Sequence, residues 1–363
     1  MSSSAGSSLL IAVLVFAGEL FAGEPAVTLS PWSCTQCDQQ KKAKIEMLRH
    51  PCDDLARICK LKQWVAIESP HFRIFSSLTR ALVRPSDSKF VAADLVRLKK
   101  LFPNLRCRRS GSRLTPHQRA HLYHIRLERL YAVFQEMTHA KQRWLGMEAP
   151  YEVFLFQGYA AHKRIANGFL NKLQDKAGVR ALVNGKPGVL VFTTAAALFG
   201  DDRKLHDNVR HHVTHNLANG YGNYYRHTWA FLAAGLAHLY EGHETDKAQT
   251  VCHAGNISRL PSKARWSRGV RLLVKRKQDR RLGRWCEKIY PHELTEQEHM
   301  LAWSLVGWMI ETDPVRFRRL LDKVEDLEHK PTAAQAIGEV YGISPDALHE
   351  RWRAYVLKSR PKR

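Results

Sequence analysis

The chain has 363 residues, which suggests about two or three structural units, and carries a formal net charge of +23 at pH 7 with a pI near 9.9. Hydrophobic residues make up 44% of it, which excludes an intrinsically disordered chain and predicts a buried core. The positive charge favours polyanionic partners such as nucleic acid, an acidic glycan or an anionic membrane, although a basic soluble surface explains it more simply.

The first 23 residues are typical of a signal peptide. An apolar run from Leu9 to Ala17 is too short to span a bilayer and is followed by small residues, with cleavage expected after Ala17 or near Ala22 and Gly23. The segment before the run has no Lys or Arg. We therefore expect an exported protein, periplasmic or extracellular, with no transmembrane segment in the mature chain.

Residues 31–60 predict a Cys-rich helical extension. Its cysteines, Cys34, Cys37, Cys52 and Cys59, follow the pattern C-x2-C…C-x6-C. In an oxidising compartment this pattern predicts a two-disulfide clip of undetermined pairing, whereas in a reducing one it could hold zinc, so export favours disulfides. Cys252 and Cys286 are a further candidate pair, which leaves Cys107 as the odd thiol.

Residues 64–245 predict an α/β subdomain. The alternation from Trp64 to Leu78 indicates two strands joined at Ser69-Pro70, and Val91 to Leu101 is the one helix in a charged insertion. Thr115-Pro116 begins a long amphipathic helix. We also expect a strand at Tyr151–Gln157, a helix at Tyr159–Leu173 and a strand at Gly188–Thr194.

A histidine pair follows these elements. His211 and His215 lie four residues apart, so on a helix they share a face and can direct two imidazoles at one ion. In the zinc-hydrolase pattern His-Glu-x-x-His, the residue after the first His is the general base, and here that position is His212. The alternative interpretation is a polar helix surface or a satisfied histidine cluster.

A second helical run begins near Thr228, and its segment FLAAGLAHLYE resembles the Trp-Leu-x-Glu-Gly-Leu-Ala-x-Tyr-x-Glu helix of gluzincin-type metallopeptidases, the peptidase MA-like group. The resemblance extends to secreted bacterial peptidase MA-like families of unknown function, and it implies a small sheet beside the zinc helix. It places a zinc-ligating Glu at the position of Ala234. His238 and Glu241, one and two turns beyond Ala234, are weaker candidate ligands.

The segment 251–286 is strongly basic. Between residues 259 and 285 it holds eleven Lys and Arg residues and one acidic residue, Asp279. The candidate polyanion-binding residues are Arg271, Lys275, Arg276, Lys277, Arg280 and Arg281. Because no nucleic-acid motif surrounds them, we do not expect nucleic-acid binding, and a solvated charged face is the simpler interpretation.

Residues 295–357 predict a helical C-terminal subdomain. Leu301, Leu305, Trp308 and Met309 form one helical stripe, a second helix follows Asp313-Pro314, and Ser344 is the expected N-cap of the closing helix. These sequence segments resemble the helical subdomain that follows the metal-binding helices in the secreted peptidase MA-like families.

The sequence thus predicts an α+β, mostly helical fold with a small sheet beside a zincin-like pair of helices and a helical C-terminal subdomain. Because the general-base Glu and a ligand Glu are replaced, we expect a non-catalytic binding or scaffold protein whose partner is a peptide or an envelope protein. We expect no cofactor, and zinc is the one candidate. One alternative is a residual zinc-dependent peptidase that uses His211 and His215. The other is a basic polyanion-binding protein.

Overall fold

The structure, a computed structural model, describes residues 32–37, 45–87, 90–139, 144–145, 147–171, 178–183, 188–222, 228–244, 263–326 and 328–359. The expected signal peptide and Cys252 lie outside these residues. The predicted fold class is confirmed, since a mixed sheet packs beside a predominantly helical remainder. No helix in the described part of the chain is both long enough and apolar enough to cross a membrane.

A six-stranded sheet forms the centre of the α/β part. Its order is β1 (Ser33–Cys34), β4 (Val65–Glu68), β5 (Phe72–Ser76), β8 (Tyr151–Phe156), β10 (Val189–Ala195) and β9 (Gly178–Val183). The β5–β8 and β8–β10 pairs are parallel and the other pairs are antiparallel. Every residue of β8 and β10 is buried, as expected of strands covered on both faces.

Two hydrophobic clusters cover the two faces of this sheet. On one face, helices α4 (Pro116–Thr138) and α6 (Asp202–Tyr221) contribute to the largest core cluster. On the other face, helices α2 (Cys52–Ile58) and α5 (Tyr159–Gly168) pack on side chains such as Phe75 and Phe154. The metal motif predicted from the sequence therefore lies on the α4 side of the sheet.

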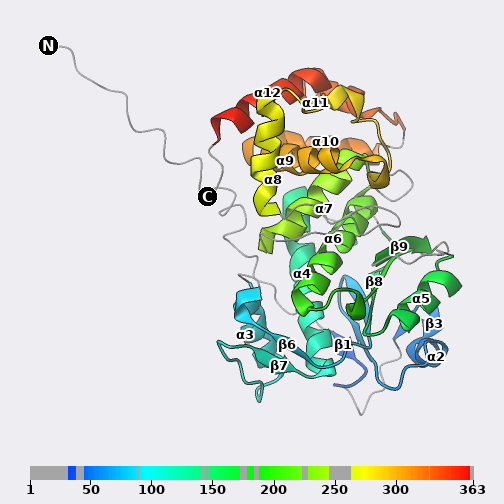
Figure 1. Cartoon of the computed structure of the whole chain (residues 1–363). Helices are drawn as coiled ribbons and strands as arrows, with labels where there is room; N and C mark the ends of the chain where they lie inside the picture. The colour runs from blue at the N-terminus through cyan, green and yellow to red at the C-terminus, as the bar shows by residue number, and fades with distance from the viewer. Residues whose placement is uncertain are drawn as a thin grey trace.

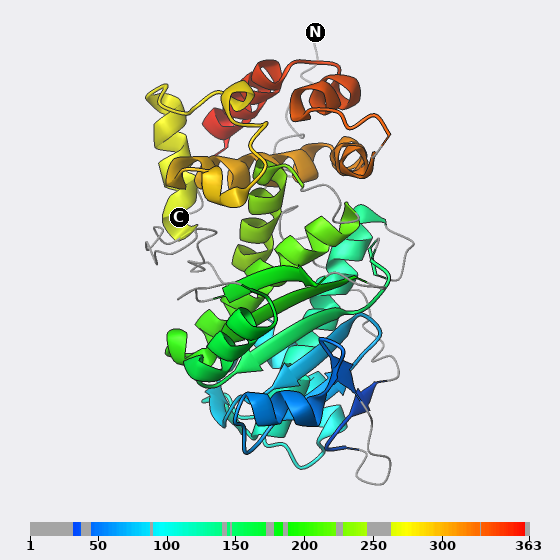
Figure 2. The same cartoon turned by 90° about the vertical axis from the view of Figure 1, so that its right-hand side faces the viewer.

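The C-terminal helices form a separate layer. Helix α7 (Ala230–Glu244) leads from α6 toward α9 (Glu296–Thr312), and helices α8 to α12 gather beyond them, away from the sheet (Figures 1 and 2). Gly235 of α7 permits a close approach to α9, because a Cβ atom there would lie 2.4 Å from Val306 Cγ2 and 2.7 Å from the Ala302 carbonyl oxygen. Packing alone thus requires a glycine at this position of α7.

Shorter elements complete the fold. They are the strands β2 (Glu46–Met47), β3 (His50–Pro51), β6 (Ala81–Val83) and β7 (Ser112–Leu114), the helices α3 (Val91–Leu101), α8 (Lys263–Lys275), α10 (Pro314–Glu325), α11 (Ala333–Tyr341) and α12 (Pro345–Lys358), and the 3-10 helices η2 (Pro85–Asp87), η3 (Ala196–Leu198), η4 (Leu282–Arg284) and η5 (Pro291–Glu293). Strands β2 and β3 pair as a hairpin, as do β6 and β7.

Several predicted boundaries agree with the structure. Helix α3 has the predicted bounds, and Thr115 caps α4 by accepting a hydrogen bond from the Gln118 amide. Ser344 likewise caps α12. The described residues of the extension at 31–60 are less helical than expected, because Glu46–Met47 pairs with His50–Pro51 as a hairpin and α2 is the only helix among them.

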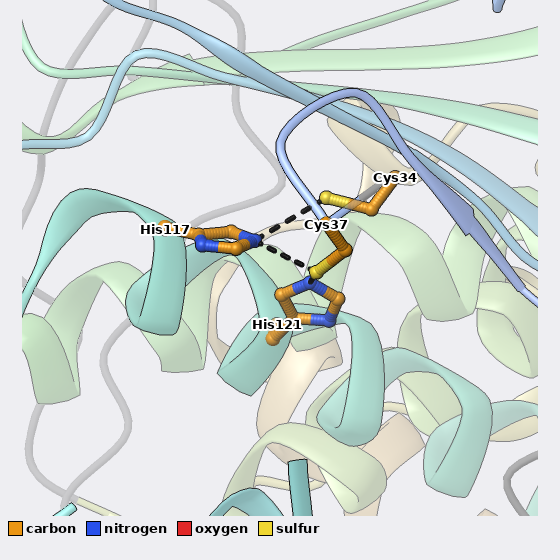
Figure 3. A group of neighbouring side chains, drawn as sticks. All are labelled: Cys34, Cys37, His117 and His121. Carbon is orange, nitrogen blue, oxygen red and sulfur yellow. Dashed lines mark hydrogen bonds between the residues drawn. The ribbon is translucent and has the colours of Figure 1, made fainter. Parts of the chain in front are cut away.

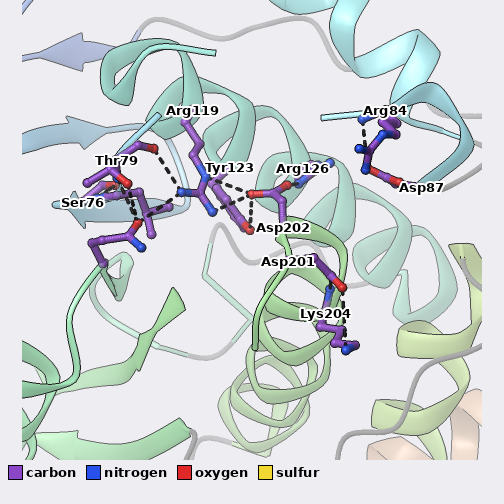
Figure 4. Close-up of polar contacts among 12 residues, drawn as sticks. Ser76, Thr79, Arg84, Asp87, Arg119, Tyr123, Arg126, Asp201, Asp202 and Lys204 are labelled. Atoms are coloured by element: carbon purple, nitrogen blue, oxygen red, sulfur yellow. Dashed lines mark hydrogen bonds and ion pairs between the residues drawn. The ribbon is translucent and has the colours of Figure 1, made fainter. Parts of the chain in front are cut away.

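A buried ion-pair network fixes the start of α6 against α4 (Figure 4). Arg119 Nε donates to Asp202 Oδ1 at 2.9 Å, and Arg126 Nη1 donates to Asp202 Oδ2 at 3.1 Å. Burial alone would raise the pKa of Asp202, but Arg126 and Arg119 outweigh it and hold that pKa below its usual value. The charged contacts therefore orient the helix that carries the predicted histidine motif.

Candidate functional site

The two predicted ligand histidines lie on one face of α6, as expected from their spacing. The ring centroids of His211 and His215 are 4.9 Å apart, and both side chains are fully buried. The potential ligand atoms that converge within 4.8 Å of one another, however, belong to His211, His238 and Glu241. The structure thus brings His238 and Glu241 to His211 and leaves His215 outside this group.

Glu241 is the centre of this group. His211 Nδ1 lies 3.1 Å and His238 Nδ1 lies 3.3 Å from the same atom, Glu241 Oε2, so both imidazoles can donate to one carboxylate oxygen. His238 Nε2 lies 3.2 Å from Nδ1 of His299, which α9 contributes. His211, His238, Glu241 and His299, here called the buried His–Glu cluster, connect α6, α7 and α9 and are at most 1% exposed.

The general-base position faces the sheet. The ring of His212 stacks on Phe192 of β10 with 5.1 Å between centroids and an interplanar angle of 22°. A Cβ atom at Gly178 would lie 2.7 Å from His212 Cδ2, so the glycine at the start of β9 leaves room for this ring. His212 is therefore packed between α6 and two strands.

The ligand position on α7 offers no donor atom. Ala234 is fully buried within the main core cluster, together with Leu232 and Leu236 of the same helix. The carboxylate of the buried His–Glu cluster comes from Glu241, seven residues further along. Glu241 corresponds to the final Glu of the pattern that the segment resembles, so the chain keeps that carboxylate and lacks the one at position 234.

His215 has a strongly perturbed environment. Burial, with a further contribution from Arg180 and the neighbouring histidines, lowers its pKa well below the usual value. Its imidazole is therefore neutral at physiological pH, because protonation would place an additional positive charge in a buried, already basic site.

The predicted two-disulfide clip is absent among the described residues, and its cysteines lie in two places. Cys34 belongs to the core cluster on the α4 face, whereas Cys52 and Cys59 belong to the cluster on the opposite face. Cys52 begins α2 and Cys59 follows its last residue, so the two are seven residues apart along the helix. This spacing corresponds to about 10.5 Å along the helix axis, which exceeds the Cα–Cα separation that a disulfide allows. The sheet therefore separates Cys34 from Cys52 and Cys59.

Cys52, Cys59 and Cys286 are buried thiols. Burial, followed by the nearby Glu152 charge, raises the pKa of Cys52 to about 12, and burial raises that of Cys59 to about 11. Both are inert core thiols. Cys286 is also buried, with its Sγ 3.9 Å from Glu287 Oε1. Because Cys252 lies outside the described residues, its pairing with Cys286 stays a prediction.

Three of the six candidate polyanion-binding residues contact other parts of the C-terminal helical layer. Arg271 donates to the Val356 and Ser359 carbonyls, Arg280 Nη1 lies 3.3 Å from Glu298 Oε1, and Arg281 faces Asp346 and Glu350 at 3.9 and 3.7 Å. Lys275, Arg276 and Lys277 at the end of α8 are exposed, and so are Arg280 and Arg281, whose side chains are 54% and 55% exposed. Polyanion binding stays a prediction, which a steep salt dependence of binding would support.

Comparisons of the chain with protein-family models, with curated proteins and with solved structures find no match. The similarity to gluzincins therefore stays a prediction that rests on the residues of α6, α7 and the C-terminal helices. The chemistry of the site has to be judged from its own geometry.

That geometry fits two kinds of chemistry. Two imidazole nitrogens and one carboxylate oxygen are donors that zinc accepts, and around a tetrahedral ion such atoms lie about 3.3 Å apart. The same 3.1 and 3.3 Å separations are hydrogen bonds from two N–H groups to one carboxylate. Catalysis would also require an open coordination position, whereas all members of the buried His–Glu cluster are excluded from solvent.

Proposed function

We propose that this chain is an exported, non-catalytic binding protein built on a zincin-like frame, in which the buried His–Glu cluster joins helices instead of activating water. The observation that carries the proposal is that Glu241 Oε2 is shared by His211 and His238 at 3.1 and 3.3 Å in a fully buried setting. A carboxylate held in this way satisfies two buried imidazoles and links α6 to α7.

The residues at the catalytic positions support the same proposal. Loss of a general base costs about 10²–10⁴ in rate, and the imidazole of His212 is stacked on Phe192 on the sheet side of α6. Ala234 removes a metal ligand as well, which weakens any ion that would activate water. The frame is therefore better suited to hold a partner than to hydrolyse one.

The partner that we propose is an extended peptide segment of an envelope protein, bound along β9. This strand ends the sheet order and, among the described strands, pairs only with β10. Gly178, Arg180, Leu182 and Val183 are half-buried there, so side chains and backbone of the strand reach the surface. An extended segment can add to such an edge by main-chain hydrogen bonds, a mode of binding that needs no catalytic zinc.

A peptide array probed with the mature protein tests the binding surface. Successive backbone N–H groups of a strand point to opposite sides, so of Arg180→Pro and Ala181→Pro one removes an N–H on the outer edge of β9 and the other removes an N–H that bonds to β10. The variant that loses the outer N–H should keep the native circular dichroism and thermal midpoint. We expect this folded variant to lose peptide binding, with Arg180→Lys as the control. Full binding by that folded proline variant would contradict strand addition.

A residual zinc peptidase is the second candidate, and the convergence of His211, His238 and Glu241 within 4.8 Å is the observation that favours it. Zinc content, measured by mass spectrometry on mature protein purified without a metal-affinity tag, separates the two candidates. We expect Glu241→Gln, which keeps the shape of the side chain, to leave the zinc content unchanged and no peptide to be hydrolysed. Zinc lost in Glu241→Gln, together with hydrolysis by the unaltered protein, would establish the peptidase instead.

A further inference from the structure

The N-terminal cysteines meet two histidines of α4 that lie far away in sequence. Cys34 Sγ is 3.4 Å and Cys37 Sγ is 3.1 Å from His117 Nε2, and Cys37 Sγ is also 3.4 Å from His121 Nε2 (Figure 3). One ligand atom from each of the four residues lies within 4.8 Å of all the others. We propose that Cys34, Cys37, His117 and His121 form a structural zinc site that fastens the N-terminal segment to α4.

Local structure presents each ligand pair to the same point. Cys34 ends β1 and Cys37 follows in the adjoining turn, so the C-x2-C spacing places both sulfurs on one side of the chain. His117 and His121 are four residues apart in the first turns of α4, with ring centroids 5.0 Å apart. The Thr115 capping box fixes where this helix begins, and therefore where its two imidazoles point.

The separations match those of zinc ligands. Zinc bonds of about 2.3 Å to sulfur and about 2.0 Å to nitrogen at tetrahedral angles place the two ligand atoms about 3.5 Å apart. The observed sulfur–nitrogen distances are 3.1 to 3.4 Å. If the contacts were separate hydrogen bonds, each thiol would need to approach only one imidazole. Instead, His117 Nε2 is close to both sulfurs and Cys37 Sγ is close to both imidazoles. A single central ion explains this shared proximity.

The surroundings suit a closed structural site. Cys34 and His121 are buried, and His117 is half-buried, so most of the ligand set is shielded from solvent. The edges of Trp32 and Phe102 flank the His121 ring at 4.7 and 5.4 Å. Two sulfurs and two nitrogens give zinc four protein ligands, which leaves no position for a catalytic water.

Such a site would stabilise an otherwise weak part of the fold. Strand β1 has two residues and pairs only with β4 among the described strands, at the end of the sheet order. The Cys37–His117 contact joins residues 80 positions apart, so a zinc ion would close a long loop and fix β1 against α4. Zinc binding would also explain why these two cysteines face histidines.

Metal analysis of the mature chain, purified under reducing conditions without a metal-affinity tag, tests the site. We expect about one zinc per chain, lost in Cys37→Ser and His117→Ala and retained in Glu241→Gln. Cys37 is exposed and His117 is half-buried, so these variants should still fold. Cobalt substitution should give the intense thiolate-to-cobalt absorption of a tetrahedral centre, which the same two variants should lack.

Three results would overturn the site. They are the absence of zinc after its addition to fully reduced protein, retention of zinc in both Cys37→Ser and His117→Ala, and a Cys34–Cys37 disulfide that persists in the reductant. Loss of zinc in Glu241→Gln but not in Cys37→Ser or His117→Ala would overturn this site and place the ion between α6 and α7. The proposed non-catalytic function fails only if the unaltered protein also hydrolyses peptides, so hydrolysis distinguishes the failure of one proposal from the failure of the other.

Discussion

His211 and Glu241 link α6 to α7 in the core, with 3.1 Å between His211 Nδ1 and Glu241 Oε2 and both side chains fully buried. A buried carboxylate is stable only if its partners compensate for the lost hydration. The link therefore joins the two helices only as long as both partners are present, and its removal should affect stability before it affects any reaction.

Replacing Glu241 by Ala should destabilise the fold by about 3–5 kcal/mol, because two buried imidazoles lose their shared acceptor. Glu241→Gln should cost less, since its amide oxygen has two lone pairs and can accept both hydrogen bonds, although it lacks the negative charge. Urea unfolding followed by circular dichroism measures both variants. Equal stability of the Ala variant and the unaltered protein would show that the buried His–Glu cluster contributes nothing to the packing of α6 and α7.

Chelation should separate the proposed zinc site from the buried His–Glu cluster. A ligand that binds only the folded state stabilises it in proportion to the logarithm of its concentration over Kd, so removing zinc should lower the thermal midpoint by several degrees. The midpoint of Cys37→Ser should not respond to the chelator, whereas Glu241→Gln should respond as the unaltered protein does. A response of equal size in Cys37→Ser would place the stabilising ion elsewhere.

Asp202→Asn should lower stability at pH 7 by about 3–5 kcal/mol, because Arg119 and Arg126 would lose their buried counter-charge. The pKa of Asp202 is depressed in the folded state, so its contribution is fully present above the unfolded value of about 3.9 and is lost as pH falls through the folded value. The difference in unfolding free energy between the two proteins should therefore shrink in strong acid. Denaturant titrations across the acid range measure it, and a constant difference would assign the effect to packing.

The sequence predicted those features of the fold that depend on local signals. Thr115-Pro116 and Ser344 cap the helices expected after them, and the spacing of His211 and His215 places them on one face of α6. Strand β9 was missed, since its sequence GVRALV shows no clear alternation of apolar and polar residues. The start of α6 at Asp202 was also missed, although Asp201 is a typical capping residue and Leu205, Val209, Val213 and Leu217 recur every four residues after it.

The candidate sites depended on tertiary contacts that spacing cannot supply. His299 offered no signal in an apolar helix, yet it contacts His238 at 3.2 Å. His117 and His121 carried the same four-residue spacing as His211 and His215, but nothing in the sequence relates them to Cys34 and Cys37. The disulfide expectation rested on the cysteine spacing and the expected compartment, with zinc as the alternative in a reducing one, and neither observation shows that the sheet lies between Cys34 and the other two cysteines, Cys52 and Cys59.

Gly235→Ala tests whether the glycine of α7 is explained by packing instead of by a catalytic motif. The new methyl group would lie 2.4 Å from Val306 Cγ2 and 2.7 Å from the Ala302 carbonyl oxygen, so α7 and α9 would have to separate. Overpacking of this kind costs about 1–3 kcal/mol, which urea unfolding would measure. Val306→Ala added to the variant removes only the side-chain clash, and we expect it to restore part of the loss because the backbone contact remains. Full stability of Gly235→Ala would show that the two helices can move apart at no cost, and the glycine would then need a different explanation.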